Sequence, residues 1–270
     1  MFPPGADPGP SFADLVRRTR GDGPPLPDLT ADDRLAITHG TTVVAIRYAD
    51  GVVMAGDRRA TSGNLISHRT MEKVYPADRH SGVAIAGAAG PAVEMVHLFQ
   101  LQLEHYEKVE GAHLSLEGKA NQLGAMVRNN LPAAMQGLAV VPLFAGYDTR
   151  RQIGRLFQYD VTGGRYEESN YASTGSGSLH AGTVVKLGYR EGLDRGEVLD
   201  LALSALFQAA DEDSATGGPD VLRGIYPVMA TITAEGFLRA EDSEIAERFA
   251  ALTERLAATR STTTSGGAPS

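Results

Sequence analysis

The sequence contains no cysteine among its 270 residues. This absence excludes disulfides, a thiol nucleophile and cysteine-based metal sites, so any nucleophilic side chain would have to react through an oxygen or an amine. The seven histidines include no H-E-x-x-H or similar spacing, which is the pattern that a catalytic zinc would require. We therefore expect neither a metal ion nor another cofactor.

Positive charge and long apolar runs are also scarce. The net charge is −8, from 25 basic and 33 acidic residues, and no basic stripe exists that could neutralise phosphates, so we expect no nucleic-acid partner. No stretch approaches the roughly 20 apolar residues that a bilayer span needs. The first 20 residues lack the apolar centre of a secretory signal. These features predict a cytoplasmic protein with no membrane partner.

Proline and glycine are concentrated at the amino-terminal end. Seven of the 14 prolines and five glycines lie within residues 1–40, and such a composition disfavours regular structure. We call residues 1–40 the leader. The sequence predicts three parts: this leader, one folded domain at residues 41–260, and a flexible Ser/Thr/Gly-rich tail at residues 261–270.

Strands and helices are expected in separate groups within the folded domain. Strand patterns cover residues 42–48, 52–56, 82–87, 140–147, 153–161, 166–173 and 226–233. Helix patterns cover residues 91–109, 115–138, 178–189, 196–211 and 243–257. Pro132 would kink or end the second helix. This grouping predicts an α+β fold in which antiparallel sheets carry helices on their outer faces.

The junction between the leader and the folded domain carries the chemistry. Gly40 is followed by Thr41, and a β-branched strand pattern begins there. A threonine that cleavage has made amino-terminal offers a hydroxyl nucleophile and an α-amine of pKa roughly 8, which can accept the hydroxyl proton. Gly40 would let the backbone bend so that Thr41 attacks its own preceding carbonyl. We therefore expect self-activation by cleavage between Gly40 and Thr41.

Six segments, taken in order along the chain, resemble those of a known family. They are residues 40–45, 51–59, 71–74, 86–90, 175–178 and 213–218. Together they resemble the β-subunits of 20S proteasomes, closest to the actinobacterial forms, which are threonine peptidases among the N-terminal-nucleophile hydrolases. The resemblance runs from Thr41 to the last expected strand. It implies a four-layer αββα sandwich, in which two antiparallel sheets lie between helices.

The resemblance also implies catalytic roles. Thr41 would be the nucleophile, and Asp57 and Lys73 would form a charge pair beneath it. A lysine ammonium near the threonine oxygen favours the alkoxide and lowers the pKa of the neighbouring amine. Gly87 would donate its backbone N–H to the oxyanion of the tetrahedral intermediate. Arg59 would brace Asp57 or the nearby loop.

Three further residues are implied to support the amine. Ser176 and Asp213 resemble the groups that hold the amine and a water molecule. Thr216 stands where the family commonly has serine, and threonine keeps the hydroxyl donor and acceptor while adding a methyl group.

The resemblance places a substrate pocket beside these residues. Its expected lining is Ala60, Met71, Tyr75, Ile85, Ala89 and Val93. Because none of these side chains is charged, we expect a preference for apolar residues before the cut, as in chymotrypsin. Thr61 and Ala89 would hold the substrate backbone as an added strand.

The implied assembly is a pair of heptameric β rings, stacked face to face and capped by rings of α-type subunits. The sites would face an enclosed chamber that only unfolded or tagged proteins enter, delivered by an ATP-dependent unfoldase. We expect the leader to block the threonine amine until assembly, and to bridge neighbouring subunits while the rings form.

Three alternatives remain open. The chain could be a non-catalytic ring subunit, although such subunits lack the threonine or its lysine partner. It could be another self-processing amidohydrolase, such as the smaller two-ring bacterial peptidase, which normally has almost no leader. An α-type subunit would carry an amino-terminal helix in place of a cleavable Gly-Thr junction.

Overall fold

The computed structural model describes residues 40–62 and 65–264 of the chain. The leader apart from Gly40, and residues 265–270 of the expected tail, lie outside the described residues. None of the helices in the described part combines the length and the apolar character that a transmembrane segment requires.

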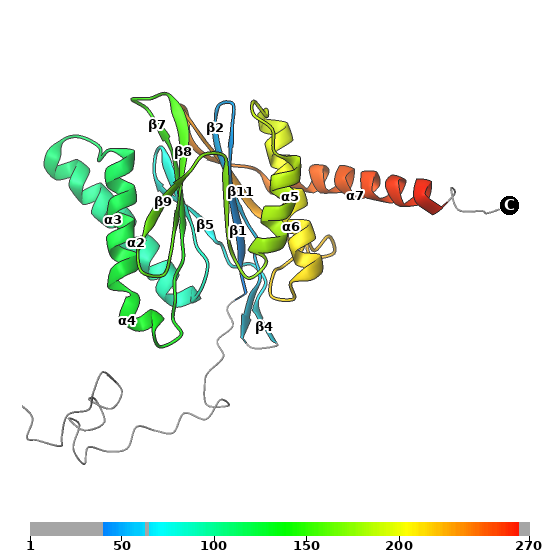
Figure 1. The fold of residues 1–270 in the computed structure, drawn as a ribbon, viewed down its shortest axis with the longest axis horizontal. Helices are drawn as coiled ribbons and strands as arrows, with labels where there is room; N and C mark the ends of the chain where they lie inside the picture. The colour runs from blue at the N-terminus through cyan, green and yellow to red at the C-terminus, as the bar shows by residue number, and fades with distance from the viewer. Residues whose placement is uncertain (1–39, 63–64, 265–270) are drawn as a thin grey trace, which may run out of the picture. The chain divides into compact units, whose positions relative to one another are not determined.

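Two antiparallel five-stranded sheets form the centre of the described domain (Figure 1). The first sheet has the order β10-β1-β2-β11-β12 and the second has the order β5-β6-β7-β8-β9. In the first sheet the strands are β1 (Thr42–Tyr48), β2 (Gly51–Gly56), β10 (Tyr171–Gly175), β11 (Val228–Thr233) and β12 (Gly236–Arg239). In the second they are β5 (Val74–Asp78), β6 (Ser81–Ala84), β7 (Leu143–Asp148), β8 (Ile153–Tyr159) and β9 (Arg165–Glu168). A separate pair joins β3 (Ala60–Ser62) to β4 (Leu65–His68).

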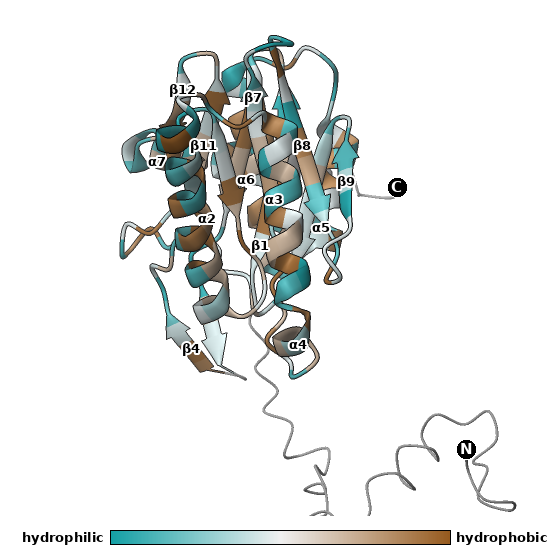
Figure 2. Ribbon diagram, turned by 90° about the vertical axis from the view of Figure 1, so that its left-hand side faces the viewer, coloured by the Kyte–Doolittle hydropathy of each residue, from teal (hydrophilic) through white to brown (hydrophobic). Residues whose placement is uncertain are grey.

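Helices cover the outer face of each sheet. The second sheet is covered by α2 (Ala89–Glu110) and α3 (Leu116–Asn129), and the short α4 (Leu131–Ala134) follows. Figure 2 shows α2 and α3 in front of this sheet. The first sheet is covered by α5 (Ser178–Gly188) and α6 (Arg195–Glu212), and α7 (Asp242–Thr264) packs against the same core through its first turns. The predicted α+β fold with four layers is confirmed.

Strand β1 illustrates how the sequence specifies these layers. Side chains alternate between the two faces of a strand. Val44 and Ile46 pack into the core beneath α5 and α6, whereas Val43 and Ala45 pack into the core between the two sheets. All four are fully buried. A strand that is covered on both faces is apolar throughout, which explains why β1 carries a nearly continuous apolar run.

The prediction of a single strand at residues 166–173 was wrong. The structure divides this stretch between β9 in the second sheet and β10 in the first. Ser169 and Asn170 lie at the bend between them, and both residue types favour turns over strands. The chain therefore crosses from one sheet to the other at this point, which brings the end of β10 beside the start of β1.

Several short strands were not predicted: β3, β4, β5 and β12. Strand β5 contains Pro76, which weakens a strand pattern, but β5 lies at the edge of its sheet. Proline is tolerated there because an edge strand leaves N–H groups unpaired. The predicted helix at 115–138 is divided at Asn130, ahead of Pro132, as the kink prediction allowed. Helix α7 continues to Thr264, beyond residue 261 where we expected the tail; no proline or glycine interrupts the helix before that point.

Candidate active site

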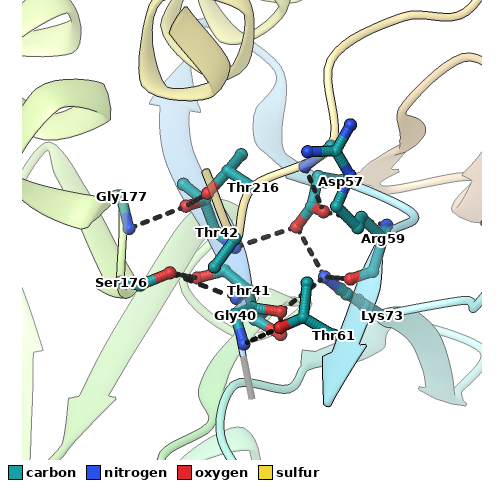
Figure 3. A network of polar contacts seen from close by, with 12 residues as sticks. Gly40, Thr41, Thr42, Asp57, Arg59, Thr61, Lys73, Ser176, Gly177 and Thr216 are labelled. Atoms are coloured by element: carbon teal, nitrogen blue, oxygen red, sulfur yellow. Dashed lines mark hydrogen bonds and ion pairs between the residues drawn. The ribbon is translucent and has the colours of Figure 1, made fainter. Parts of the chain in front are cut away.

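Four segments that are distant in sequence meet at the start of β1 (Figure 3). Thr41 directly precedes β1, and Asp57 directly follows β2. Lys73 precedes β5, and Ser176 follows β10. Thr41, Asp57 and Lys73 are buried, with exposed fractions of 5%, 0% and 1%. The sheet arrangement therefore places the residues expected from the sequence around one junction.

Lys73 makes three contacts with its ammonium group. Its Nζ lies 2.7 Å from Asp57 Oδ1 and donates to the carbonyl oxygens of Arg59 at 2.5 Å and Gly40 at 3.3 Å. An ammonium has three protons, so these contacts use all of them. The predicted Asp57–Lys73 charge pair is thus present in the structure, directed at the peptide that joins the leader to Thr41.

Asp57 is also held by three backbone N–H groups. Its carboxylate accepts N–H groups from Thr42, Arg59 and Gly217, each at 2.9 Å. A Cβ added at Gly217 would lie 2.6 Å from Cβ of Arg59, so only glycine lets this loop approach so closely. The three N–H donors fix the carboxylate beneath Lys73. The Arg59 side chain braces the nearby loop, since its Nη1 donates to the Ser214 carbonyl at 3.0 Å.

The surroundings of Lys73 shift its protonation equilibrium. Burial lowers the pKa of Lys73 below its ordinary value, against the attraction of the Asp57 carboxylate, which raises that pKa. A lysine with a lowered pKa can exchange a proton with a neighbouring hydroxyl more readily than a solvated lysine can. The site therefore holds a proton-transfer group within reach of the junction.

The threonine hydroxyl lies against the carbonyl that precedes it. Thr41 Oγ1 donates to the Gly40 carbonyl oxygen at 2.8 Å. Lys73 Nζ donates to the same oxygen, and the Gly40 N–H donates to Thr61 Oγ1 at 3.2 Å. The hydroxyl, the carbonyl and the lysine are thus gathered at one peptide bond, as a self-cleaving junction requires.

A second network holds Thr41 from the opposite side. Ser176 Oγ accepts the Thr41 N–H at 3.3 Å and donates to Asp213 Oδ2 at 2.5 Å. Thr216 donates to the same carboxylate oxygen at 2.6 Å. Burial alone would raise the pKa of Asp213, but hydrogen bonds from Ser176, Thr216 and the Ala215 N–H hold that pKa below its ordinary value. Asp213 is therefore an ionised acceptor that orients Ser176 toward Thr41.

Sequence reasoning missed the side chain of Thr42. Its Oγ1 lies 2.5 Å from Thr216 Oγ1 and accepts the Gly177 N–H at 3.0 Å. Because the Thr216 proton goes to Asp213, Thr42 must be the donor between the two hydroxyls. No local sequence pattern predicts this contact, since Thr42 and Thr216 are 174 residues apart.

The exchange of serine for threonine at position 216 gives a testable difference. Thr216 is fully buried, and Thr216→Val would remove both its donated and its accepted hydrogen bond. We expect Thr216→Val to lower the free energy of unfolding by about 1–3 kcal/mol, since it leaves buried polar groups unsatisfied. Thr216→Ser, which keeps the hydroxyl, should cost less. Urea unfolding of both variants measures the difference; equal losses would mean that the hydroxyl contributes no more to stability than the methyl group does.

Gly87 has a backbone conformation that favours glycine, but its role as the oxyanion donor stays a prediction. Its φ is +108°, and it forms an isolated bridge with Val140. A Cβ here would lie 2.1 Å from the Ala139 carbonyl oxygen. Among the contacts of the described residues, the Gly40 oxygen is bonded by Thr41 and Lys73 and not by Gly87.

The expected substrate-pocket residues fall into two groups. Met71, Tyr75, Ile85 and Val93 belong to one apolar cluster beneath α2. Ala60 and Thr61 lie on β3, and Ala89 is the first residue of α2. In the described part of the chain, no group of three or more His, Asp or Glu side chains is arranged to hold a metal ion.

Comparison with known proteins identifies the family. The model of the proteasome subunit family matches residues 37–222, which is more than half of the chain. The chain belongs to the proteasome subunit family.

Two relatives illustrate the match. The chain is 59% identical over 254 residues to a proteasome subunit beta of Acidimicrobium ferrooxidans, covering 92% of this chain and 90% of that protein. It is 62% identical over 217 residues to a proteasome subunit beta of Streptomyces griseus, covering 80% and 77%. The resemblance to actinobacterial proteasome β-subunits that the sequence predicted is confirmed.

Proposed function

We propose that this chain is the catalytic β-subunit of a 20S proteasome core, a threonine-type endopeptidase that activates itself by cutting between Gly40 and Thr41. The observation that carries the proposal is the position of the Thr41 hydroxyl, 2.8 Å from the Gly40 carbonyl oxygen, with Lys73 bonded to that same oxygen. The identity to two proteins named proteasome subunit beta supports it.

Self-cleavage would proceed through an ester. Thr41 Oγ1 adds to the Gly40 carbonyl carbon, and its proton is relayed through Lys73, which takes it up as it releases one of its own protons toward the Thr41 nitrogen. The C–N bond then breaks, the nitrogen takes a proton, and the leader is held as an ester on Thr41. Water hydrolyses this ester, which releases the leader as a carboxylic acid and restores the Thr41 hydroxyl beside the amine that C–N cleavage has already freed.

In the matured enzyme the same groups would act on substrate. Thr41 Oγ attacks the substrate carbonyl, the free amine accepts and returns the proton, and Lys73 with Asp57 keeps the field around the oxygen positive. Gly87 would donate to the oxyanion. Ser176, Asp213 and Thr216 would hold the amine in place of the peptide N–H that Ser176 now accepts.

The finer parts of the proposal concern substrates and partners. Membership of the family implies rings built with α-type subunits, and we propose heptameric β rings, cytoplasmic location, and unfolded or tagged protein substrates delivered by an ATP-dependent unfoldase. The apolar cluster that includes Met71, Tyr75, Ile85 and Val93 supports a preference for apolar residues before the cut.

The decisive measurement is the intact mass of the chain in particles assembled with the α-type partner, with and without Thr41→Ala. The wild type should begin at Thr41, whereas the Thr41→Ala variant should retain residues 1–40 and hydrolyse no peptide. If wild-type particles retain the leader, the chain is a non-catalytic ring subunit or another protein matures it. If Thr41→Ala loses the leader, cleavage is not performed by Thr41.

A further inference from the structure

We propose that Thr61 is a positioning residue for self-cleavage and acts through its side-chain hydroxyl, which accepts the N–H of Gly40. This inference rests on the proposed function, since it concerns the same peptide bond. It goes beyond the backbone role expected for Thr61 in substrate binding, because the contact is made by the side chain and to the leader.

The Gly40 residue is held at three points. Its N–H donates to Thr61 Oγ1 at 3.2 Å. Its carbonyl oxygen accepts from Thr41 Oγ1 and Lys73 Nζ. Its Cα faces Ala215, because a Cβ built on Gly40 would lie 1.9 Å from Cβ of Ala215. Thr61 supplies the contact on the leader side of Gly40 (Figure 3). Without this hydrogen bond, the Gly40 backbone could rotate while its carbonyl oxygen stayed bonded.

The local structure directs the Thr61 hydroxyl toward Gly40. Thr61 is the central residue of β3, and the register with β4 shifts between Ala60 and Thr61. Such an irregularity bends a strand and redirects its side chains. Thr61 is only 6% exposed, so its hydroxyl is fixed by packing and meets Gly40 away from bulk water, where a hydrogen bond discriminates more strongly between geometries.

The contact suits the leader better than a protein substrate. The close approach of Ala215 leaves no space for a side chain at the position of Gly40. A substrate residue with a side chain must therefore sit differently, and its N–H would not reach Thr61 Oγ1 in the same way. The hydroxyl of Thr61 thus serves self-cleavage, which each chain performs once, rather than the hydrolysis of substrates.

The test compares rates of self-cleavage in particles assembled with the α-type partner, followed by intact mass as the fraction of chains that retain the leader. Thr61→Val keeps the shape and removes the hydroxyl; Thr61→Ser and Thr61→Ala form a second pair that differs only in the hydroxyl. We expect Val and Ala to cleave about threefold to tenfold more slowly, the effect of one neutral hydrogen bond, and Ser to cleave nearly as fast as the wild type. Ser62→Ala, at the exposed neighbouring position, is the matched control and should cleave at the wild-type rate.

Each outcome has one meaning. Val and Ala cleaving at the wild-type rate would overturn the inference, and so would Ser cleaving as slowly as Ala, since the methyl group would then be what matters. If Thr61→Val fails to assemble, the Ser and Ala pair decides. A wild type that never loses its leader would overturn the proposed function itself, which is distinct from a wild type that matures alongside an unaffected Thr61→Val.

Discussion

Replacing Lys73 by methionine should leave the leader attached in assembled particles and reduce peptide hydrolysis by at least about a hundredfold, the usual effect of losing a positioned proton-transfer group. Methionine is close to lysine in length but has no proton that it can donate or transfer. The variant would lose the contacts of Nζ with Asp57, Arg59 and Gly40 together, so both the activation of Thr41 and the polarisation of the Gly40 carbonyl would be lost.

A second buried lysine provides the control. Lys119 on α3 is 6% exposed and forms an ion pair with Asp78, remote in the fold from β1. Lys119→Met breaks a buried charge pair just as Lys73→Met does, at a similar cost of about 3–5 kcal/mol in the free energy of unfolding. We expect Lys119→Met particles to mature normally where they assemble. Intact mass and hydrolysis of an apolar peptide measure both variants.

The outcomes separate chemistry from stability. Equal losses of maturation in the two variants would mean that instability explains the effect. A Lys73→Met chain that matures at the wild-type rate would remove Lys73 from the mechanism. Loss of maturation in Lys73→Met alone would show that Lys73 takes part in the chemistry.

The layers of this fold could be predicted from local patterns, because each pattern reports burial. The β1–β2 hairpin followed from two β-branched apolar runs and the helix pairs followed from helical periodicity, and these apolar segments do pack into the cores of the domain. The division of residues 166–173 between two sheets could not be predicted. The sequence on either side of the bend does not identify the sheet, because which sheet a strand joins depends on contacts far along the chain.

The site was predictable only in part, for a related reason. The Gly40-Thr41 junction is visible locally, as a change from a Pro/Gly-rich segment to a β-branched strand. The Asp57–Lys73 pair was inferred from the family resemblance, since a Gly-Asp pair alone favours a turn. The contacts of Gly217 with Asp57 and of Thr42 with Thr216 join residues 160 and 174 positions apart. Such contacts come from the folded sheets and have no signature in the sequence.

Gly40→Ala should block self-cleavage although the proposed maturation removes residue 40 from the enzyme. A Cβ at this position would lie 1.9 Å from Cβ of Ala215, and 2.5 Å from both its Cα and its carbonyl oxygen. Real Cβ atoms do not approach other atoms so closely, so the backbone must move. The loop resists, because the Ala215 N–H donates to Asp213 at 3.1 Å and Arg59 holds the Ser214 carbonyl. The Gly40 carbonyl would then withdraw from Thr41 Oγ1, and a displacement of about 1 Å can slow a positioned reaction by about a hundredfold.

A chain that begins directly at Thr41 shows whether the site hydrolyses peptides once residue 40 is absent. It should hydrolyse peptides whether or not Gly40→Ala blocks the precursor, because it lacks residue 40. Gly90→Ala is the matched control, since a Cβ there meets nothing within 4 Å, and it should mature at the wild-type rate.

The double variant Gly40→Ala with Ala215→Gly removes the Cβ contact and keeps the two backbone contacts at 2.5 Å. It should therefore mature faster than Gly40→Ala and more slowly than the wild type. Maturation of Gly40→Ala at the wild-type rate would mean that the loop carrying Ala215 yields, and that glycine at this position serves the bend of the chain rather than the space around it.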